Sequence, residues 1–360
     1  MTKKQPVSTE EAYRQALVML APGTRIREAI SAILQAGTGA LICLGDTKRL
    51  SKLSEGGVEL NAEVSPQLLY ELSKMDGAII LTPEADRILY ANRFLKPSAS
   101  FPSIETGTRH RTAQRLAAQA KCMVIAVSQR RSSVTLYVND VRHVLDDIST
   151  LVKKAEQAAQ TLEKYMSVLQ TALTELTTRE FQDVVTIFDV CRAVQRAEMV
   201  ERISREIEPY IVELGTEGRL IELQVKELLI PVQEARMVVK DYYRSKAGVT
   251  EEGVRDALRG APQDTILDLS TISQALGYGA NLRDVDTYLT PRGYRVLTAT
   301  HRLPRPIIDN LVNQFGTLQK IIRAPKDELT KVDGVGDVLA ERIRVSINLL
   351  RNQLALDDRR

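Results

Sequence analysis

The stretch ETGTRHRTA, residues 105–113, carries more anion-binding groups than any other part of the chain of similar length. Gly107 lets the backbone approach a ligand closely. Two arginines supply forked donors that suit phosphate oxygens, a histidine can donate from either ring nitrogen, and two threonines add hydroxyl groups. This pattern predicts a phosphate-binding loop whose donors are Thr108, Arg109, His110, Arg111 and Thr112.

Apolar residues recur at helical spacing over residues 112–120, so the loop is predicted to open a helix there. Free N–H groups at a helix start point towards the ligand, and the helix dipole favours a negative charge in front of them. An ordinary capped helix with two solvated arginines would show the same pattern, and a partner residue is needed to decide between the two interpretations.

That partner is predicted to be Asp76, which stands with Gly77 before an apolar run at residues 78–81. A carboxylate in this position can hold a divalent metal ion or accept a proton. Asp-Gly is also a common turn dipeptide, so a simple turn before a buried strand is the alternative.

The two motifs, taken in this order, resemble a motif pair of a known domain. Asp76-Gly77-Ala78, followed about thirty residues later by residues 109–113, RHRTA, resembles the motif pair of the diadenylate cyclase (DAC) domain. Together with the helical middle and the C-terminal hairpins described below, the whole chain resembles the DNA integrity scanning (DisA) family. The resemblance implies that two ATP molecules are joined into cyclic di-AMP, with Mg²⁺ or Mn²⁺ as cofactor.

The resemblance also implies roles for single residues. Asp76 would be the metal ligand or the base that deprotonates the attacking hydroxyl, and these two roles are left open. Arg109, His110 and Arg111 would be catalytic, because they hold the triphosphate and neutralise the leaving pyrophosphate. The implied nucleotide contacts are Gly77, Ala78, Leu95, Thr108, Arg109, His110, Arg111, Thr112 and Ser128.

The N-terminal part, residues 1–147, alternates helical and strand patterns, and several strands are apolar on both faces. This predicts an α/β domain with a mixed sheet covered by helices. Gly37 and Gly39 precede one strand, but a third glycine is missing and no helix follows, so a dinucleotide-binding loop is rejected.

The middle part, residues 148–290, is predicted to be an all-α domain because glycine is absent from residue 148 until Gly215. Further helices are predicted at residues 178–214 and 216–246. A first long helix is predicted from apolar residues that repeat at spacings of four and three, which is typical of a coiled-coil seam: Leu151, Ala155, Ala158, Leu162, Tyr165, Leu169, Ala172 and Leu176.

The C-terminal part, residues 291–360, carries 13 Lys and Arg against 8 Asp and Glu, a net charge of +5. Within it, VDGVGDVLAERI at residues 332–343 resembles the helix-hairpin-helix motif, in which a glycine turn presents backbone N–H groups to a DNA phosphate. Plain helix turns and protein contacts use the same sequence, so they are the alternatives. The predicted DNA contacts are Gly334, Val335, Gly336 and Arg342.

A second, degenerate hairpin is predicted upstream, at residues 302–311, as part of an all-α tandem helix-hairpin-helix domain. Arg302 and Pro304 stand where its glycines would be, which puts its own phosphate contact in doubt. Contacts to phosphate favour DNA shape over sequence. The family resemblance adds branched DNA as the regulator, a homo-octamer, and recombination or repair proteins as partners.

Composition limits the class of protein and its location. The 44% of hydrophobic residues suffice for real cores, and no apolar run approaches the ~20 residues of a membrane helix. The chain is therefore expected to be cytoplasmic and, from its DNA contacts, nucleoid-associated, with no membrane partner. Cys43, Cys122 and Cys191 stand far apart in apolar segments, so they are predicted to be core thiols in a reducing compartment.

Two other functions are compatible with parts of the sequence. A DNA-structure sensor could bind a nucleotide without reacting it, although mere binding would not require Asp76. Hydrolysis of cyclic dinucleotides would need a metal-held water, and the sequence shows no clustered His and Asp ligands for it.

Overall fold

The structure is a computed structural model that describes residues 8–280, 286–299 and 303–357. Contacts within the chain divide it into two compact units. The first unit comprises Met1–Gln157 and Ile207–Glu222, and the second comprises Ala158–Glu206 and Leu223–Arg360. The boundaries of the three predicted domains stay predictions.

The first unit is built on one mixed sheet with the order β2-β5-β4-β1-β6-β7-β8, and β3 pairs with β5. β1 and β4 are parallel, whereas β1 and β6 are antiparallel. The predicted α/β class is confirmed. The strands are β1 Ala40–Leu44, β2 Ser54–Glu55, β3 Val58–Glu63, β4 Ala78–Leu81, β5 Arg87–Leu95, β6 Met123–Ser128, β7 Ser133–Val138 and β8 Val141–Leu145.

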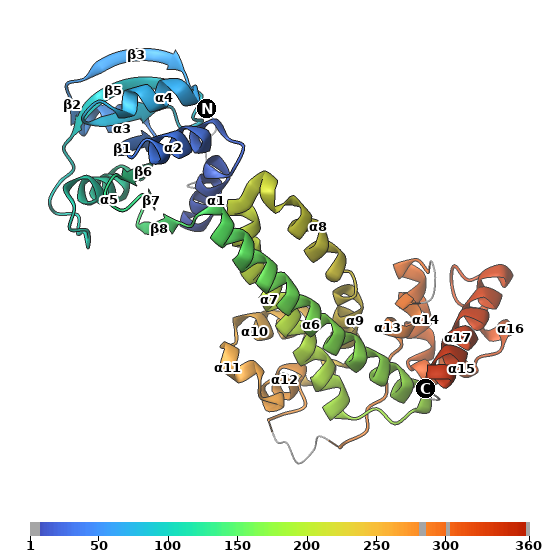
Figure 1. The fold of residues 1–360 in the computed structure, drawn as a ribbon. Coiled ribbons are helices and arrows are strands. Elements are labelled where there is room, and N and C mark those ends of the chain that lie inside the picture. Colours follow the sequence, from blue (N-terminus) through green and yellow to red (C-terminus); the bar gives the residue numbers. More distant parts are fainter. Residues whose placement is uncertain (1–7, 281–285, 300–302, 358–360) are drawn as a thin grey trace. The chain divides into compact units, whose positions relative to one another are not determined.

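Helices cover both faces of this sheet, because successive strand residues point to opposite sides. Ile42 and Leu44 pack into the core under α1, α2 and α4, while Leu41 and Cys43 pack into the core under α3 and α5. Figure 1 shows α2 and α4 side by side, and α5 beside β6 and β7. The helices are α1 Thr9–Leu20, α2 Arg25–Gln35, α3 Thr47–Lys52, α4 Pro66–Ser73 and α5 Thr108–Ala120.

The second unit is helical in its described residues, apart from an isolated bridge between Thr186 and Tyr288. The predicted helix at residues 178–214 is wrong at its start. α6 continues to Gln182, and the chain turns at Asp183 with a φ of 62° before α7 begins at Ile187. The helices from here to the C-terminus are α6 Ile148–Gln182, α7 Ile187–Leu214, α8 Arg219–Leu228, α9 Val232–Tyr242, α10 Glu251–Gly260, α11 Gln263–Ile266, α12 Leu269–Leu276, α13 Tyr294–Ala299, α14 Arg305–Phe315, α15 Leu318–Arg323, α16 Lys326–Leu329 and α17 Asp337–Asp357.

A buried polar cluster joins α6, α9 and α13 inside the second unit. The Arg295 side chain is 1% exposed and pairs with the equally buried Glu180, and its Nη1 donates to Glu234 Oε1 at 2.7 Å. Asp241 accepts the backbone N–H groups of Gly293 and Arg295 at 2.7 and 2.8 Å, so it caps the start of α13. Every charge in this cluster therefore has a partner, as burial requires.

The three cysteines are free and buried, as predicted. In the described ranges, no helix is both long and apolar enough to cross a membrane.

Candidate functional site

Helix α5 begins at Thr108, four residues earlier than predicted. Gly107 adopts an extended conformation as N-cap and offers no side chain to cap the helix. The first intrahelical bond runs from the Arg111 N–H to the Gly107 carbonyl, at 2.9 Å. The N–H groups of residues 108–110 have no acceptor in the described part of the chain, so they remain available to an anion.

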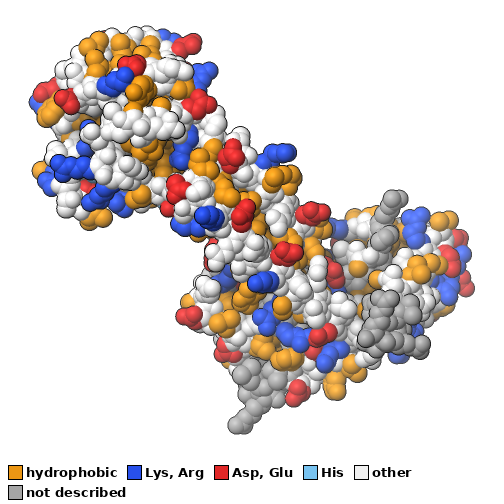
Figure 2. All heavy atoms as spheres, viewed as in Figure 1, with side chains coloured by type: hydrophobic (Ala, Val, Ile, Leu, Met, Phe, Trp, Pro, Cys, Tyr) orange, Lys and Arg blue, Asp and Glu red, His pale blue; other side chains and the backbone are white. Residues whose placement is uncertain are grey.

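A cavity of about 720 Å³ opens at this helix start. Its walls come from the loop before α5, the turn at residues 128–133 between β6 and β7, and strands β7 and β8. Figure 2 shows Lys and Arg side chains gathered on the part of the first unit that α5 and its loop occupy in Figure 1. Four arginines line the cavity against a single carboxylate, that of Glu105: Arg109, Arg130, Arg131 and Arg142.

Arg109 reaches across the end of the sheet. Its Nη1 donates to the Val127 carbonyl at 3.3 Å. A Cβ atom on Gly39 would stand 1.9 Å from this same nitrogen, so any other residue here would push the guanidinium out of its observed position. Gly39 therefore allows the Arg109 side chain to lie against the backbone here, a role that the sequence alone did not reveal.

A hydrogen-bonded network fixes the side of the cavity that His110 lines. Glu105 Oε1 accepts from Arg142 Nε at 2.6 Å and from the Tyr137 hydroxyl at 2.8 Å. The Tyr137 oxygen lies 3.0 Å from His110 Nδ1. None of Glu105, Tyr137 and Arg142 was predicted, because β7 and β8 bring two of them to the loop from far along the chain.

Burial raises the pKa of the Glu105 carboxyl, but the hydrogen bonds from Arg142 and Tyr137 outweigh it and leave this pKa below its ordinary value. Burial lowers the pKa of His110, and the neighbouring arginines lower it further, although Glu105 opposes them. At neutral pH, Glu105 is therefore ionised and His110 is neutral.

Arg111 and Thr112 lie outside the cavity lining. The Arg111 Nε donates to the Glu105 carbonyl at 3.2 Å and its Nη2 donates to the Thr106 carbonyl at 3.1 Å. Arg111 therefore braces the loop in this structure. Its predicted contact with the triphosphate stays a prediction.

Asp76 lies at the same end of the sheet as Arg109. Continuing the parallel register of β1 and β4 by two residues places Gly77 beside Ala40, and the antiparallel register of β1 and β6 places Ala40 beside Val127. Two strand spacings, about 10 Å, therefore separate Gly77, the neighbour of Asp76, from the Val127 carbonyl that Arg109 contacts. Neither Asp76 nor Gly77 is among the residues that line the cavity.

Asp76 is exposed and forms no hydrogen bond or ion pair with any described residue. Gly77 has a φ of 90°, and a Cβ there would lie 2.9 Å from the Arg93 carbonyl oxygen, so this position requires glycine. Ala78 and Leu95 are buried in the core beneath α5, whereas Ser128 lines the cavity.

No three His, Cys, Asp or Glu side chains of the described residues cluster as metal ligands. Mg²⁺ is commonly held by one or two carboxylates together with substrate phosphates. Asp76 is exposed and has no partner among the described residues, so its carboxylate fits that mode of binding.

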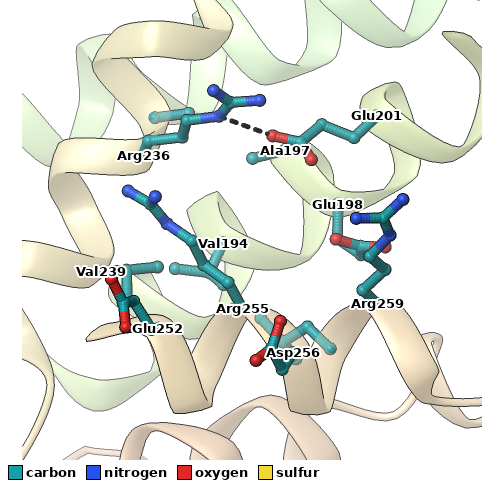
Figure 3. A pocket seen from close by; sticks show the side chains of 12 residues that line it. Val194, Ala197, Glu198, Glu201, Arg236, Val239, Glu252, Arg255, Asp256 and Arg259 are labelled. Carbon is teal, nitrogen blue, oxygen red and sulfur yellow. Dashed lines mark hydrogen bonds and ion pairs between the residues drawn. The ribbon is translucent and has the colours of Figure 1, made fainter. Parts of the chain in front are cut away.

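A second cavity, of about 350 Å³, lies among α7, α9 and α10 in the second unit. Figure 3 shows its arginines interleaved with carboxylates, with Arg236 bonded to Glu201. Four acidic residues and three arginines line it, so it offers no excess of positive charge to a polyphosphate.

At the C-terminus, α17 begins directly after the glycine turn. Gly334 has a φ of 82°, and Gly336 is exposed. The Val335 side chain is buried and its N–H donates to the Val332 carbonyl at 3.0 Å, so neither group is free to contact DNA. Arg342 is exposed on α17, while Arg302 lies outside the described residues.

Known proteins resemble this chain over nearly its whole length. The DNA integrity scanning protein DisA of Carboxydothermus hydrogenoformans is 48% identical over 345 residues, covering 96% of this chain and 98% of that protein. DisA of Clostridium kluyveri is 45% identical over 352 residues, covering 97% and 98%. A solved structure of DacA from Staphylococcus aureus covers 38% of this chain and 89% of its own at 21% identity, with a TM-score of 0.30.

Two family models also match: residues 27–142 match the DisA bacterial checkpoint controller nucleotide-binding family, and residues 145–285 match its linker region. The fold and these matches define a protein with an α/β nucleotide-binding domain followed by a helical linker. The chain belongs to the DNA integrity scanning protein DisA family.

Proposed function

We propose that the first unit is a diadenylate cyclase, which joins two ATP molecules into cyclic di-AMP and releases two pyrophosphates. One observation carries the proposal: Asp76 and the arginine-lined cavity lie at one end of the same sheet, in a domain of the DisA nucleotide-binding family. Binding alone would be served by the arginines, whereas an exposed carboxylate at the same end of the sheet suits a reaction at the nucleotide.

The reaction asks for positioning and charge stabilisation. Arg109 and the uncapped N–H groups of α5 would hold the triphosphate and neutralise the leaving pyrophosphate. Asp76 would accept the proton of the attacking 3′-hydroxyl or hold Mg²⁺ or Mn²⁺, which neutralises phosphate charge when bound. Because the product has two-fold symmetry, a second copy of the chain would supply the second ATP, within an assembly we propose to be an octamer.

Incubation with ATP and Mn²⁺, followed by chromatography of the products, tests the proposal. Wild type should form cyclic di-AMP, and Asp76→Asn should form none. Asp140→Asn is the matched control, because Asp140 is an exposed acid whose ion pair is with Lys121. Nucleotide binding without any product from wild type would favour the non-catalytic sensor instead.

We also propose that residues 291–360 form a helix-hairpin-helix module that binds branched DNA at the nucleoid. The N–H groups of Gly336, Asp337 and Val338 have no acceptor among the described residues, and they stand at the start of α17. Arg342 adds an exposed positive charge one to two turns further along. Helix starts of this kind bind DNA phosphates without reading bases.

Gly336→Asp is the sharper variant for this module, because a Cβ there meets nothing within 4 Å, whereas Gly334 has a positive φ that strains any other residue. We expect Gly336→Asp and Arg342→Glu to weaken binding of a four-way junction, and Arg351→Glu, at an exposed site near the far end of α17, to have a smaller effect.

A saturating junction should also suppress ATP turnover in wild type. Unchanged turnover would contradict the proposed regulation.

A further inference from the structure

We propose that Tyr137 and Glu105 hold His110 in the tautomer with its proton on Nδ1, so that His110 engages a nucleotide phosphate only after Nε2 takes up a proton. The inference rests on the proposed function, since it takes the ligand of the cavity to be ATP. It makes Tyr137 and Glu105 positioning residues that act through His110.

The first step is the charge of Glu105. Its side chain is 11% exposed and its Oε1 accepts from Arg142 Nε at 2.6 Å. A carboxylate that is nearly buried and bonded to a guanidinium stays ionised at neutral pH. Glu105 is therefore only an acceptor, and any group bonded to it must donate.

The second step follows from the single proton of the Tyr137 hydroxyl. The Tyr137 oxygen lies 2.8 Å from Glu105 Oε1, so the hydroxyl donates its proton there. The same oxygen lies 3.0 Å from His110 Nδ1 and has only lone pairs left to offer. Nδ1 must therefore carry a proton and donate it, since the opposite arrangement would leave two acceptors facing each other.

The third step concerns the other ring nitrogen. In a neutral imidazole with the proton on Nδ1, Nε2 carries a lone pair. His110 lines the cavity, and its Nε2 has no hydrogen-bond partner in the described ranges. Burial keeps the free protein's His110 neutral, and the one nearby carboxylate, that of Glu105, opposes it. Three arginines, from α5, from the turn after β6 and from β8, also favour the neutral ring: Arg109, Arg131 and Arg142.

A bound polyphosphate would favour the protonated form of His110 over the neutral form. Its negative charge beside the ring favours the imidazolium. One proton from solvent then binds Nε2, which becomes an N–H donor to a phosphate oxygen, while Nδ1 keeps its bond to Tyr137. No covalent bond is broken, and the net change is one proton bound for each nucleotide captured.

Calorimetric titration of the full chain tests this step. The ligand is 3′-deoxy-ATP, which lacks the attacking hydroxyl, and it is added with excess Mg²⁺. The titration is repeated in buffers of different ionisation enthalpy, so that the number of protons taken up on binding can be measured. At about pH 7.5 its phosphates are ionised, since a phosphate ester loses its second proton near a pKa of about 6. We expect wild type to take up on the order of one proton per nucleotide.

In Tyr137→Phe the uptake should fall towards zero, because the ring proton is then free to move to Nε2 and donate to phosphate without protonation. Tyr70→Phe is the control, since Tyr70 lies on α4, away from the cavity. Ring nitrogen NMR gives an independent readout, because the chain has only three histidines and His110→Gln assigns the signal. Wild type should show the proton on Nδ1.

Nucleotide binding with no proton uptake in wild type would overturn the inference. Equal uptake in wild type and Tyr137→Phe would do the same, as would an NMR signal with the proton on Nε2. If 3′-deoxy-ATP does not bind at all, the proposed function itself fails, so the two failures can be told apart.

Discussion

Two arginine clusters in this chain differ in how their charges are matched. Arg295 is buried in the second unit, and its guanidinium is bonded to Glu180 and Glu234. Arg109 lines an open cavity whose four arginines face one carboxylate, that of Glu105. Matched charges in a buried site hold helices together, whereas unmatched charges around a cavity attract a ligand. Arginine content alone would not separate the two roles.

The largest expected effect is on stability, at the matched cluster. Arg295→Ala leaves Glu180 buried without its cation, which costs about 3–5 kcal/mol. Urea unfolding followed by helical circular dichroism should show this loss. Arg259→Ala, at an exposed site, should change stability by less than about 0.5 kcal/mol. A similar small change for Arg295→Ala would mean that the cluster does not stabilise the second unit.

The next effect should fall on activity, at the unmatched cluster. Arg109→Ala removes a donor that the proposed function assigns to the phosphates, so cyclic di-AMP formation should drop about 10²- to 10³-fold, or roughly 2.7–4 kcal/mol. Its unfolding curve should match that of wild type. Arg14→Ala, which breaks an exposed ion pair with Glu208, is the control and should keep full activity. Unfolding of Arg109→Ala would make this arginine structural, like Arg295.

The buried cluster should also make the stability of the protein depend on pH, through Asp241. Burial, followed by the nearby Glu180, raises the pKa of Asp241 from 3.8 to about 7. The folded state therefore binds the proton more tightly than the unfolded state, so this contribution to stability is present below about pH 4 and is lost as pH rises through 7. Between pH 5 and 7 the unfolding free energy should fall by about 2–3 kcal/mol.

Urea midpoints measured at each pH check this trend, and Asp241→Asn should flatten it. An equal slope in wild type and Asp241→Asn would assign the pH dependence to other groups.

The smallest effect is expected at Gly39. Its added Cβ would displace Arg109 Nη1, from which it would lie 1.9 Å away. Gly39→Ala should therefore raise the KM for ATP roughly tenfold, the equivalent of one charged hydrogen bond of about 1.4 kcal/mol, with little loss of stability. Gly260→Ala, where a Cβ meets nothing within 4 Å, is the control. An unchanged KM in Gly39→Ala would show that the position of Arg109 over Gly39 is not needed.

Local pattern predicted much of the fold. The apolar runs located β1, β4 and β6, and the seam located α6. β3 was missed because its residues are mostly exposed and show no apolar alternation. The start of α5 was misplaced because Gly107, which sets it, offers no side-chain signal for a cap.

The site was predictable only in part. The motifs around Asp76 and Arg109 are contiguous, and their residue types state their chemistry directly. By contrast, Glu105 meets Tyr137 and Arg142 across 32 and 37 positions of the chain, respectively. Those contacts depend on the register of β7 and β8, which no local pattern encodes.

The sequence by itself determined which faces of the strands are apolar and which short segments are rich in basic and hydroxyl side chains, because side-chain period and residue chemistry are local properties. Only the tertiary structure decided that Arg111 braces the loop, that Arg109 lies over Gly39, and that Tyr137 stands between His110 and Glu105. Hydrogen bonds form between whichever groups lie within about 3 Å. That distance is set by how remote segments pack.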